Sequence, residues 1–445
     1  MGISIDEPLT PSLQEKVSYL GTLLQSFPDG ETAIRKLLEM TLGRKRIERL
    51  TERIGAERVG EREAEVDLFE KLTLTEKLAG PAGVVPPAAA VVMGDGGRFQ
   101  KTAQNADSKT HWYEYKAGFC ASLEGRPDGV PAGEDAPDPL PDVPKFLLNL
   151  EQVETLTREI GRKAADVPEP GEPTGDLPDD DRIRLDDVSS LEQLETLVAS
   201  ADKPREEKSS KKLPLSPKLR SRDVLATSRN SDEFGVQLAA RAWSLGLFQA
   251  ERKAFVADGG SWLWTIWERW FKPFEFVPIL DVIHAVTHLY AAATAGRPLT
   301  EGGPVYRRWI TWVWQGDVAK VIAEVAARQE QLGLPTDDDG ETNPRRIVHR
   351  TLTYLQNQHS RMNYPRYRKL GLPITSSLME STVKQLNRRI KGTEKFWNNR
   401  GGEAMLQMKA DTLSDSDPLA GYWTRRQAQQ TGLHRCCGRR MTTAA

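Results

Sequence analysis

Two apolar segments of the chain end in the same way, with an aspartate followed directly by two glycines. The first reads VVMGDGG and carries Asp95, and the second reads FVADGG and carries Asp258. A short apolar run closed by glycine is typical of a buried strand that ends at a turn. Because the carboxyl ends of neighbouring strands meet at one edge of a sheet, we expect the two aspartates to converge there.

The segments around these strands predict an α/β fold with a mixed sheet. The hairpin partner of the first strand is expected in HWYEYKAGFCASL. A β-α-β unit is predicted from RDVLATS to KAFVADGG, with Asp258 at its carboxyl end. A further strand, FEFVPILDVIH, runs directly into a helix. Four tryptophans at helical spacing are expected to pack in the core rather than to stack on bases: Trp262, Trp264, Trp267 and Trp270.

The chain of 445 residues divides into a core and several attached regions. The catalytic core is predicted from three separate ranges, 85–123, 218–300 and 370–415. The other ranges are a helical DNA-binding region at 1–78, a partly disordered acidic insertion at 124–217, a helical insertion at 301–369 and a loosely held tail at 416–445.

Charge is segregated along the chain although the formal net charge is only -2. Residues 124–187 carry 18 Asp or Glu against 7 Lys or Arg, whereas residues 345–400 carry 13 Lys or Arg against two glutamates. A basic segment of this density can displace counterions from a phosphate backbone, and a solvated basic face is the alternative.

The cellular location is expected to be the cytoplasm, in association with the nucleoid. The three cysteines cannot form a disulfide framework, and Cys436 and Cys437 have no matching ligands for a zinc site. The N-terminus is acidic where a signal peptide would be basic, and no apolar run is long enough to span a membrane.

The first 56 residues predict three helices that resemble a helix-turn-helix. The first reads LQEKVSYLGTLL, Asp29 is expected to cap the second, and the third reads RKRIERLTERIG. The third helix would present three arginines to phosphates and guanines in a major groove: Arg44, Arg46 and Arg49. A basic helical hairpin used for dimerisation is the alternative.

Glu380 is the only acidic residue between Glu341 and Glu394, and it lies in a predicted basic helix. It could supply the third carboxylate of a metal site formed with Asp95 and Asp258. The basic residues of this helix are expected to contact DNA: Lys384, Arg388, Arg389 and Lys391. The alternative is an ordinary ion pair between Glu380 and Lys384 within the helix.

A second constellation, LDVIH, places Asp281 and His284 three residues apart where a strand meets a helix. An unpartnered charge is costly in apolar surroundings, so these residues are expected to be paired or to face a metal. Asp281 is therefore a competitor of Asp258 for the role of second metal ligand, with His284 orienting it or contacting substrate.

Several blocks of the chain, in this order, resemble the core motifs of the ISKra-type bacterial insertion-sequence transposases, which are distantly similar to Mutator-type elements. The resemblance covers most of residues 85–123 and 220–410. The blocks are VVMGDGGRFQ with HWYEYKAG, AERKAFVADGGSWLWTIWERWF, ILDVIHAVTHLYAAA, and the most specific, LPITSSLMESTVKQLNRRIKGTEKFWNNRGGEAMLQMKA.

The resemblance implies an RNase H-like catalytic core interrupted by a helical insertion. It also implies that Asp95, Asp258 and Glu380 match the DDE residues, and that Asp281 and His284 match an Asp-x-x-His element. The common DDE pattern has a basic residue seven positions after the glutamate. This chain departs from that pattern, because Asn387 stands there.

We therefore expect a DNA transposase in which the three DDE carboxylates bind two Mg²⁺ ions, with Mn²⁺ as a substitute. Cleavage at a transposon end would expose a 3′-hydroxyl, which then attacks target DNA. The expected partners are double-stranded DNA and a second copy of the chain, because two ends must be paired. The rivals are a nuclease that only hydrolyses DNA and a catalytically inactive DNA-binding protein derived from a transposase.

Overall fold

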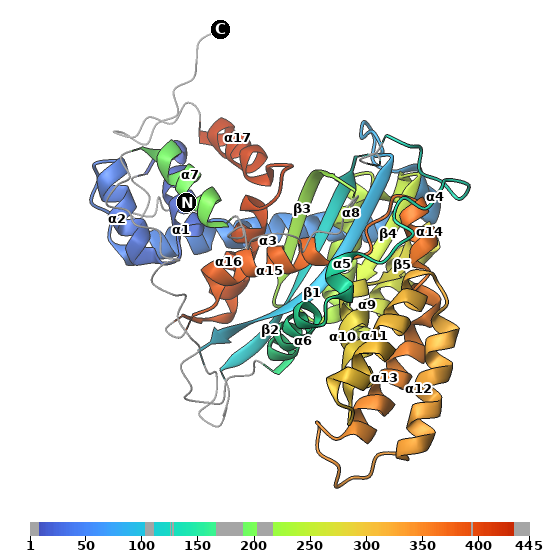
Figure 1. Ribbon diagram of the computed structural model, residues 1–445. Coiled ribbons are helices and arrows are strands. Elements are labelled where there is room, and N and C mark those ends of the chain that lie inside the picture. Colours follow the sequence, from blue (N-terminus) through green and yellow to red (C-terminus); the bar gives the residue numbers. More distant parts are fainter. Residues whose placement is uncertain are drawn as a thin grey trace, which may run out of the picture.

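A mixed six-stranded sheet forms the centre of the computed structural model, with the strand order β3-β2-β1-β4-β5 and with β6 paired to β1 (Figure 1). The structure describes residues 9–102, 111–124, 126, 129–165, 190–202, 217–392 and 395–430. The strands are β1 (Ala89–Lys101), β2 (Trp112–Leu123), β3 (Leu219–Thr227), β4 (Arg252–Ala257), β5 (Val277–Leu280) and β6 (Phe396–Trp397). The predicted mixed α/β sheet is confirmed.

The sheet contains both antiparallel and parallel pairs of strands. The predicted hairpin is confirmed, because β1 and β2 are antiparallel, and β3 is antiparallel to β2. β4 and β5 run parallel to β1. β1 is the central strand, and its first five residues, Ala89 to Met93, are at most 1% exposed. A strand that is buried on both faces reads as a continuous apolar run, which explains the pattern VVM in the sequence.

Helices cover both faces of the sheet. Tyr115 of β2 donates a hydrogen bond from Oη to Oδ1 of Asn387 in α15 (Ser377–Ile390), at 2.8 Å. Gly118, three residues later, faces α8 (Ser231–Ser244), because a Cβ there would lie 2.5 Å from Leu238. Residues an odd number apart point to opposite faces of a strand, so α15 and α8 lie on opposite faces.

Three further helices pack around the sheet, and the last of them lies against β3. They are α9 (Ser261–Ile266), α10 (Val282–Thr294) and α16 (Asn399–Thr412). The π-helical turn Trp267–Phe271 extends α9, and Trp264 is 7% exposed, as expected of a core tryptophan. Trp262, Trp267 and Trp270 are partly buried against the same core.

The N-terminal region contains the three predicted helices, α1 (Pro11–Leu23), α2 (Phe27–Leu37) and α3 (Arg44–Lys71), followed by α4 (Leu74–Ala79). The prediction that Asp29 caps α2 is wrong. Ser26 is the N-cap, and its side chain accepts a hydrogen bond from the backbone N–H of Asp29. Pro28 occupies the first turn, a position where the missing N–H of proline has no cost.

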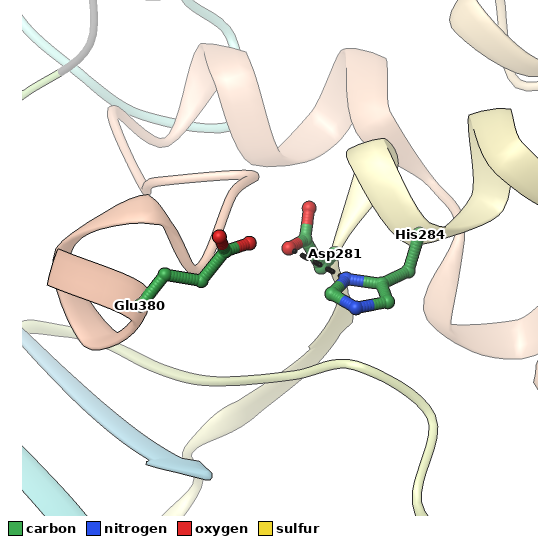
Figure 2. Close-up of side chains that lie close together, drawn as sticks. All are labelled: Asp281, His284 and Glu380. Carbon is green, nitrogen blue, oxygen red and sulfur yellow. Dashed lines mark hydrogen bonds and ion pairs between the residues drawn. The ribbon is translucent and has the colours of Figure 1, made fainter. Parts of the chain in front are cut away.

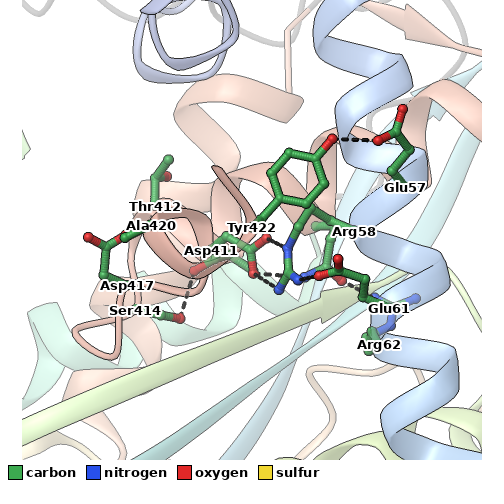
Figure 3. A network of polar contacts seen from close by, with 12 residues as sticks. Glu57, Arg58, Glu61, Arg62, Asp411, Thr412, Ser414, Asp417, Ala420 and Tyr422 are labelled. Atoms are coloured by element: carbon green, nitrogen blue, oxygen red, sulfur yellow. Dashed lines mark hydrogen bonds and ion pairs between the residues drawn. The ribbon is translucent and has the colours of Figure 1, made fainter. Parts of the chain in front are cut away.

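Helix α3 is joined to α16 by buried ion pairs, and Figure 3 shows the one between Arg58 and Asp411. Arg58 donates from Nε to Oδ2 of Asp411 in α16 at 2.9 Å, and Arg62 pairs with Glu403 of the same helix at 2.7 Å. Both arginines are nearly inaccessible to solvent. The N-terminal helices are therefore built into the core rather than tethered to it.

The expectation of a loosely held tail from residue 416 is wrong for its first part. Residues Pro418–Gln430 form α17, and Leu419, Tyr422 and Trp423 are buried in a small core with residues of α1, α2 and α3. Figure 1 shows α17 beside α1 and α2, on one side of the sheet. Residues 431–445 lie outside the described part of the chain.

Two insertions flank the core. The helical prediction for 301–369 is confirmed by α11 (Leu299–Trp314), α12 (Val318–Leu332), α13 (Pro344–Gln358) and α14 (Tyr364–Lys369), and Figure 1 shows α10 to α13 side by side.

The acidic insertion contributes α5 (Lys145–Leu148), α6 (Leu150–Ala165) and α7 (Leu191–Asp202). Val153 of α6 and Leu194 of α7 are fully buried, so these pieces belong to the folded molecule. Disorder was expected over parts of 124–217, and it stays a prediction for 166–189 and 203–216, which lie outside the described residues. No helix in the described ranges has the length and apolar character needed to cross a membrane.

Candidate active site

Three aspartates lie at the same level of three adjacent parallel strands. Asp258 and Asp281 follow β4 and β5, whereas Asp95 lies inside β1, which continues to Lys101, so the predicted turn after Asp95 is wrong. Met93 of β1 pairs with Val256 of β4, and Asp95 and Asp258 come two residues after them. β4 and β5 pair up to the residue before Asp281, in a register that continues from Asp258 to Asp281. The strand register therefore brings Asp95 and Asp258 to the same edge, as the sequence predicted. Asp281 is the next residue along that edge.

The glycines after each aspartate have local roles. The backbone N–H of Gly96 donates to Oδ1 of Asp95 at 2.7 Å, and the N–H of Gly260 donates to Oδ1 of Asp258 at 2.9 Å. A Cβ at Gly97 would lie 2.2 Å from the ring of Tyr115. The glycine N–H groups thus orient both carboxylates, at Asp95 within β1 and at Asp258 in the turn after β4.

Glu380 enters this edge from the first turn of α15, and Asp281 holds the start of that helix. Ser376, the residue before α15, donates from its backbone N–H and its hydroxyl to Oδ2 of Asp281, at 3.2 and 2.5 Å. This bond ties the start of α15 to the end of β5, and Glu380 lies four residues after Ser376. Figure 2 shows the Glu380 carboxylate directed toward Asp281 and His284.

Asp281, His284 and Glu380 each offer one ligand atom within 4.8 Å of the other two. The two Asp281 oxygens are already engaged, however. Oδ1 accepts from the backbone N–H of Ile283 at 2.8 Å, and Oδ2 contacts Nδ1 of His284 at 3.1 Å as well as Ser376. Asp281 is only 1% exposed. We therefore interpret Asp281 mainly as the residue that positions His284, α10 and α15.

The electrostatics show that five ionisable groups share one site. Burial, and then the negative charge of Asp258, raise the pKa of Asp95 to about 7, while His284 partly opposes this effect. Burial would lower the pKa of His284, but its hydrogen bond to Asp281 and the charges of Asp281, Asp258 and Glu380 together raise that pKa to about 9. An excess of carboxylates in a partly buried site favours bound cations.

The donor set at this edge suits a hard divalent cation. Asp95, Asp258 and Glu380 provide carboxylate oxygens, which are the ligands that Mg²⁺ takes. The compact cluster of Asp281, His284 and Glu380 includes an imidazole, which suits transition metals better than Mg²⁺. We favour the three-carboxylate set because Asp258 shares the edge with Asp95, whereas both oxygens of Asp281 are occupied.

Several supporting residues were not predicted. Tyr354 of α13 donates from Oη to the backbone oxygen of Asp258 at 3.0 Å. Gly259 has a φ of +109°, and a Cβ there would lie 2.8 Å from the Tyr354 ring, so glycine is required for this close approach. Ser376 and Tyr354 had no local sequence signal. Asn387, noted as a departure from the DDE pattern, accepts a hydrogen bond from Tyr115.

The predicted DNA-binding residues fall into two groups. Arg44, Arg46 and Arg49 are exposed at the start of α3, and Lys384 is exposed on α15. Arg388 and Lys391 are half-buried, and the Lys391 ammonium lies 5.5 Å from the ring centroid of Trp112.

Arg389 is not placed for DNA contact, and this assignment is corrected. It is only 2% exposed, and its Nε donates to the backbone oxygen of Gly21 at 3.0 Å. Its guanidinium lies over the rings of Phe27 and Trp397, at 4.4 and 5.2 Å. Arg389 comes nine residues after Glu380, and 3.6 residues per turn put it on the opposite side of the helix. It joins α15 to the N-terminal helices instead.

Comparison of the chain with protein-family models and with curated protein sequences finds no match.

Proposed function

We propose that the chain is a DNA transposase of the DDE class, similar to the ISKra-type enzymes, that cleaves transposon ends and transfers them to target DNA. The observation that supports the proposal is that Asp95 and Asp258 lie at equivalent positions of adjacent parallel strands and that the charges of Asp258 and Glu380 both raise the pKa of Asp95. Catalytic groups of open α/β sheets lie at the carboxyl edge of such strands.

The architecture is compatible with the RNase H-like core that the sequence resemblance implies. β1, β2 and β3 form an antiparallel meander, and β4 and β5 extend the sheet in parallel on the other side of β1. The helix that carries Glu380 follows the last of these strands and packs across β1 and β2. The helical insertion lies between β5 and that helix, as the resemblance leads one to expect.

The proposed mechanism assigns a separate task to each residue of the site. Asp95, Asp258 and Glu380 would hold two Mg²⁺ ions, or Mn²⁺ as a substitute, and these ions supply charge stabilisation for the attacking and leaving oxygens. Asp281 keeps Glu380 in place through Ser376 and orients His284. Gly97 and Gly259 let the rings of Tyr115 and Tyr354 pack directly beside the two aspartates.

The surface charges suit a double-stranded DNA substrate. Exposed arginines at the start of α3 are positioned to contact a duplex, and Lys384 lies one helical turn after Glu380, on the same face of α15. Recognition of terminal repeats by the N-terminal helices and pairing of two ends by a dimer belong to the same proposal. The same proposal includes that the protein acts in the cytoplasm, at the nucleoid.

A strand-transfer assay separates this proposal from a purely hydrolytic nuclease and from an inactive DNA-binding protein. The protein is given pre-cleaved DNA ends taken from the sequence that flanks its gene, together with Mg²⁺ and a target plasmid. We expect joined products in which the 3′ end is linked to the target. Cutting without joined products would indicate a nuclease, and binding without either product would indicate an inactive protein.

A further inference from the structure

The helix that carries Glu380 is attached to the rest of the molecule near both of its ends. Its start is attached to the end of β5 by the hydrogen bonds from Ser376 to Asp281. Its last turn carries Arg389, which contacts the N-terminal helices. Arg389 lies about 14 Å along the helix axis from Glu380, at 1.5 Å per residue. The position of Glu380 therefore depends on two attachments, and the second one reaches the region that is expected to bind DNA.

The Arg389 guanidinium is held by backbone oxygens and aromatic rings. Nε donates to the backbone oxygen of Gly21 at 3.0 Å, and Nη1 donates to that of Gln25 at 3.4 Å. The charge lies over the rings of Phe27 and Trp397. Among the described residues, no carboxylate forms an ion pair with the guanidinium, and Nη2 has no hydrogen-bond acceptor. A buried cation without a carboxylate partner is costly, so nearby charges strongly affect its energy.

Three carboxylates of the N-terminal helices act on Arg389 from a greater distance. Burial lowers the pKa of Arg389 to about 10, and the charges of Asp29, Glu48 and Glu52 oppose this effect. Asp29 belongs to α2, and the two glutamates belong to α3. The cost of burying the guanidinium therefore depends on where α2 and α3 lie relative to α15.

Helix α3 links the expected DNA contacts to the acceptor of the Arg389 hydrogen bond. Thr51 of α3 is fully buried, and a Cβ at Gly21 would lie 2.4 Å from its Oγ1. α3 thus touches α1 at the residue whose backbone oxygen binds Arg389. The exposed arginines at the start of α3 lie within about two helical turns of Thr51. A displacement of α3 by bound DNA would be passed directly to α15.

We propose that Arg389 couples DNA binding by the N-terminal helices to the position of Glu380, so that the metal site is completed when a transposon end is bound. This inference rests on the proposed function. Arg389 is a positioning residue, because it acts on the site only through α15. Since a coupling between two binding sites is reciprocal, bound end DNA should tighten metal binding, and bound metal should tighten the binding of end DNA.

Titration of the full-length protein with Mn²⁺ measures this coupling, with free Mn²⁺ followed by electron paramagnetic resonance. Two duplexes of equal length are compared, one with the terminal repeat but without the bond that is cleaved, and one with a scrambled sequence. Both bring the same number of phosphates, so they differ only in recognition of the repeat. We expect the repeat duplex to tighten Mn²⁺ binding about tenfold, which is within the usual range of such couplings.

Two buried arginines provide matched variants. Arg389→Lys keeps the charge but removes the planar group that reaches two backbone oxygens. It should bind the repeat duplex and Mn²⁺ separately as before, whereas the tenfold effect should fall below about twofold. Arg368→Lys is the control, because Arg368 is also buried, lies over Trp314 at 4.4 Å and donates to its backbone oxygen, but joins α14 to the acidic insertion. It should keep the full effect.

Glu52→Gln tests the same link from α3 and does not depend on the stability of Arg389→Lys. Glu52 is half-buried, and its charge is one of those that favour the charged form of Arg389. The variant should bind the repeat duplex normally but show a smaller effect of that duplex on Mn²⁺ affinity. Urea unfolding shows that each variant is folded under the conditions of the titration.

The outcomes separate this inference from the proposed function. Equal Mn²⁺ affinity of the unmodified protein with the two duplexes would overturn the coupling alone, provided that the protein cleaves DNA. A full effect in both Arg389→Lys and Glu52→Gln would overturn the role of Arg389, and so would equal losses in Arg389→Lys and Arg368→Lys. Failure to bind Mn²⁺ with either duplex would overturn the three-carboxylate site and the transposase with it.

Discussion

At the scale of single residues, Asp258 and Asp281 lie next to each other on the sheet but differ in their surroundings. Asp258 is half-buried and is oriented mainly by the N–H of Gly260. Asp281 is buried and binds Ile283, His284 and Ser376. The sequence left these two aspartates as competitors for one role. We propose two separate roles, with Asp258 as a metal ligand and Asp281 as the positioning residue.

Substitution by asparagine should separate these roles. Asp281→Asn should lower the free energy of unfolding by about 1–3 kcal/mol, because it disturbs a buried hydrogen-bond network. It should also lower DNA cleavage by about 10–100-fold, as expected for a residue that orients the site. Asp258→Asn should leave stability nearly unchanged and remove cleavage altogether. Urea unfolding and a cleavage assay measure both quantities, and the reverse pattern would exchange the two assignments.

Glu403 gives a pH-dependent contribution to stability. Although burial opposes it, the positive charge of Arg62 and hydrogen bonds from Thr227, Arg62 and Ser228 hold the pKa of Glu403 below its ordinary value of 4.5. A lowered pKa means that the stabilisation is fully present above about pH 4.5 and is lost as the pH falls through the folded-state pKa.

Glu403→Gln tests this contribution. At pH 7 the variant should be less stable by about 1–3 kcal/mol, because the buried arginine loses its carboxylate. The difference from the unmodified protein should shrink as the pH is lowered below 4.5. Urea unfolding at neutral and acidic pH measures it, with the exposed Glu63→Gln as the control. A difference that stays constant with pH would rule out ionised Glu403 as the source.

At the scale of secondary-structure elements, local pattern predicted the strands and most helices. The apolar runs before Asp95 and Asp258 are buried strands, and the pattern of LDVIH placed the junction of β5 and α10 correctly. These elements were predictable because their burial follows from residues within one short segment. The equivalent positions of Asp95 and Asp258 followed from the same information, although β1 continues past Asp95 to Lys101 and only its parallel pairing with β4 ends before it.

The contacts that organise the site were not predictable in this way. Ser376 and Asp281 are 95 residues apart, and Tyr354 and Asp258 are 96 apart. No local pattern encodes such pairs. The assignment of Arg389 to DNA was an avoidable error, because helical spacing from Glu380 already placed it on the other face of α15.

Helix α17 was not predicted, because its burial depends on α1, α2 and α3, which are distant in the sequence. Its packing can be tested by mutation. Trp423 is 3% exposed in the small core formed with α1, α2 and α3. Trp423→Ala should destabilise the N-terminal helices by about 3–5 kcal/mol, as is usual for a buried tryptophan. The neighbouring exposed Thr424→Ala is the control and should have little effect. Limited proteolysis should cut α1 or α2 faster in Trp423→Ala only, and equal rates would show that α17 does not hold these helices.

At the scale of the whole molecule, the parts that the sequence separates along the chain form one connected structure. α3 is linked to α16 by buried ion pairs, and Arg389 links α15 to the loop after α1. The acidic insertion also contacts α14 of the helical insertion, where Glu134 pairs with Arg366 and Asp138 with Arg368. A DNA duplex contacted by α3 would therefore be fixed in position relative to the site that carries Glu380.

The most direct test of the central claim is Mg²⁺-dependent cleavage of DNA that carries the element's ends, measured for three single variants. Asp95→Ala, Asp258→Ala and Glu380→Ala should each abolish cleavage while still binding the DNA, because each removes one carboxylate of the same site. Asp338→Ala, which removes an exposed carboxylate from a loop of the helical insertion, should cleave normally. Full cleavage by any of the three site variants would contradict the account.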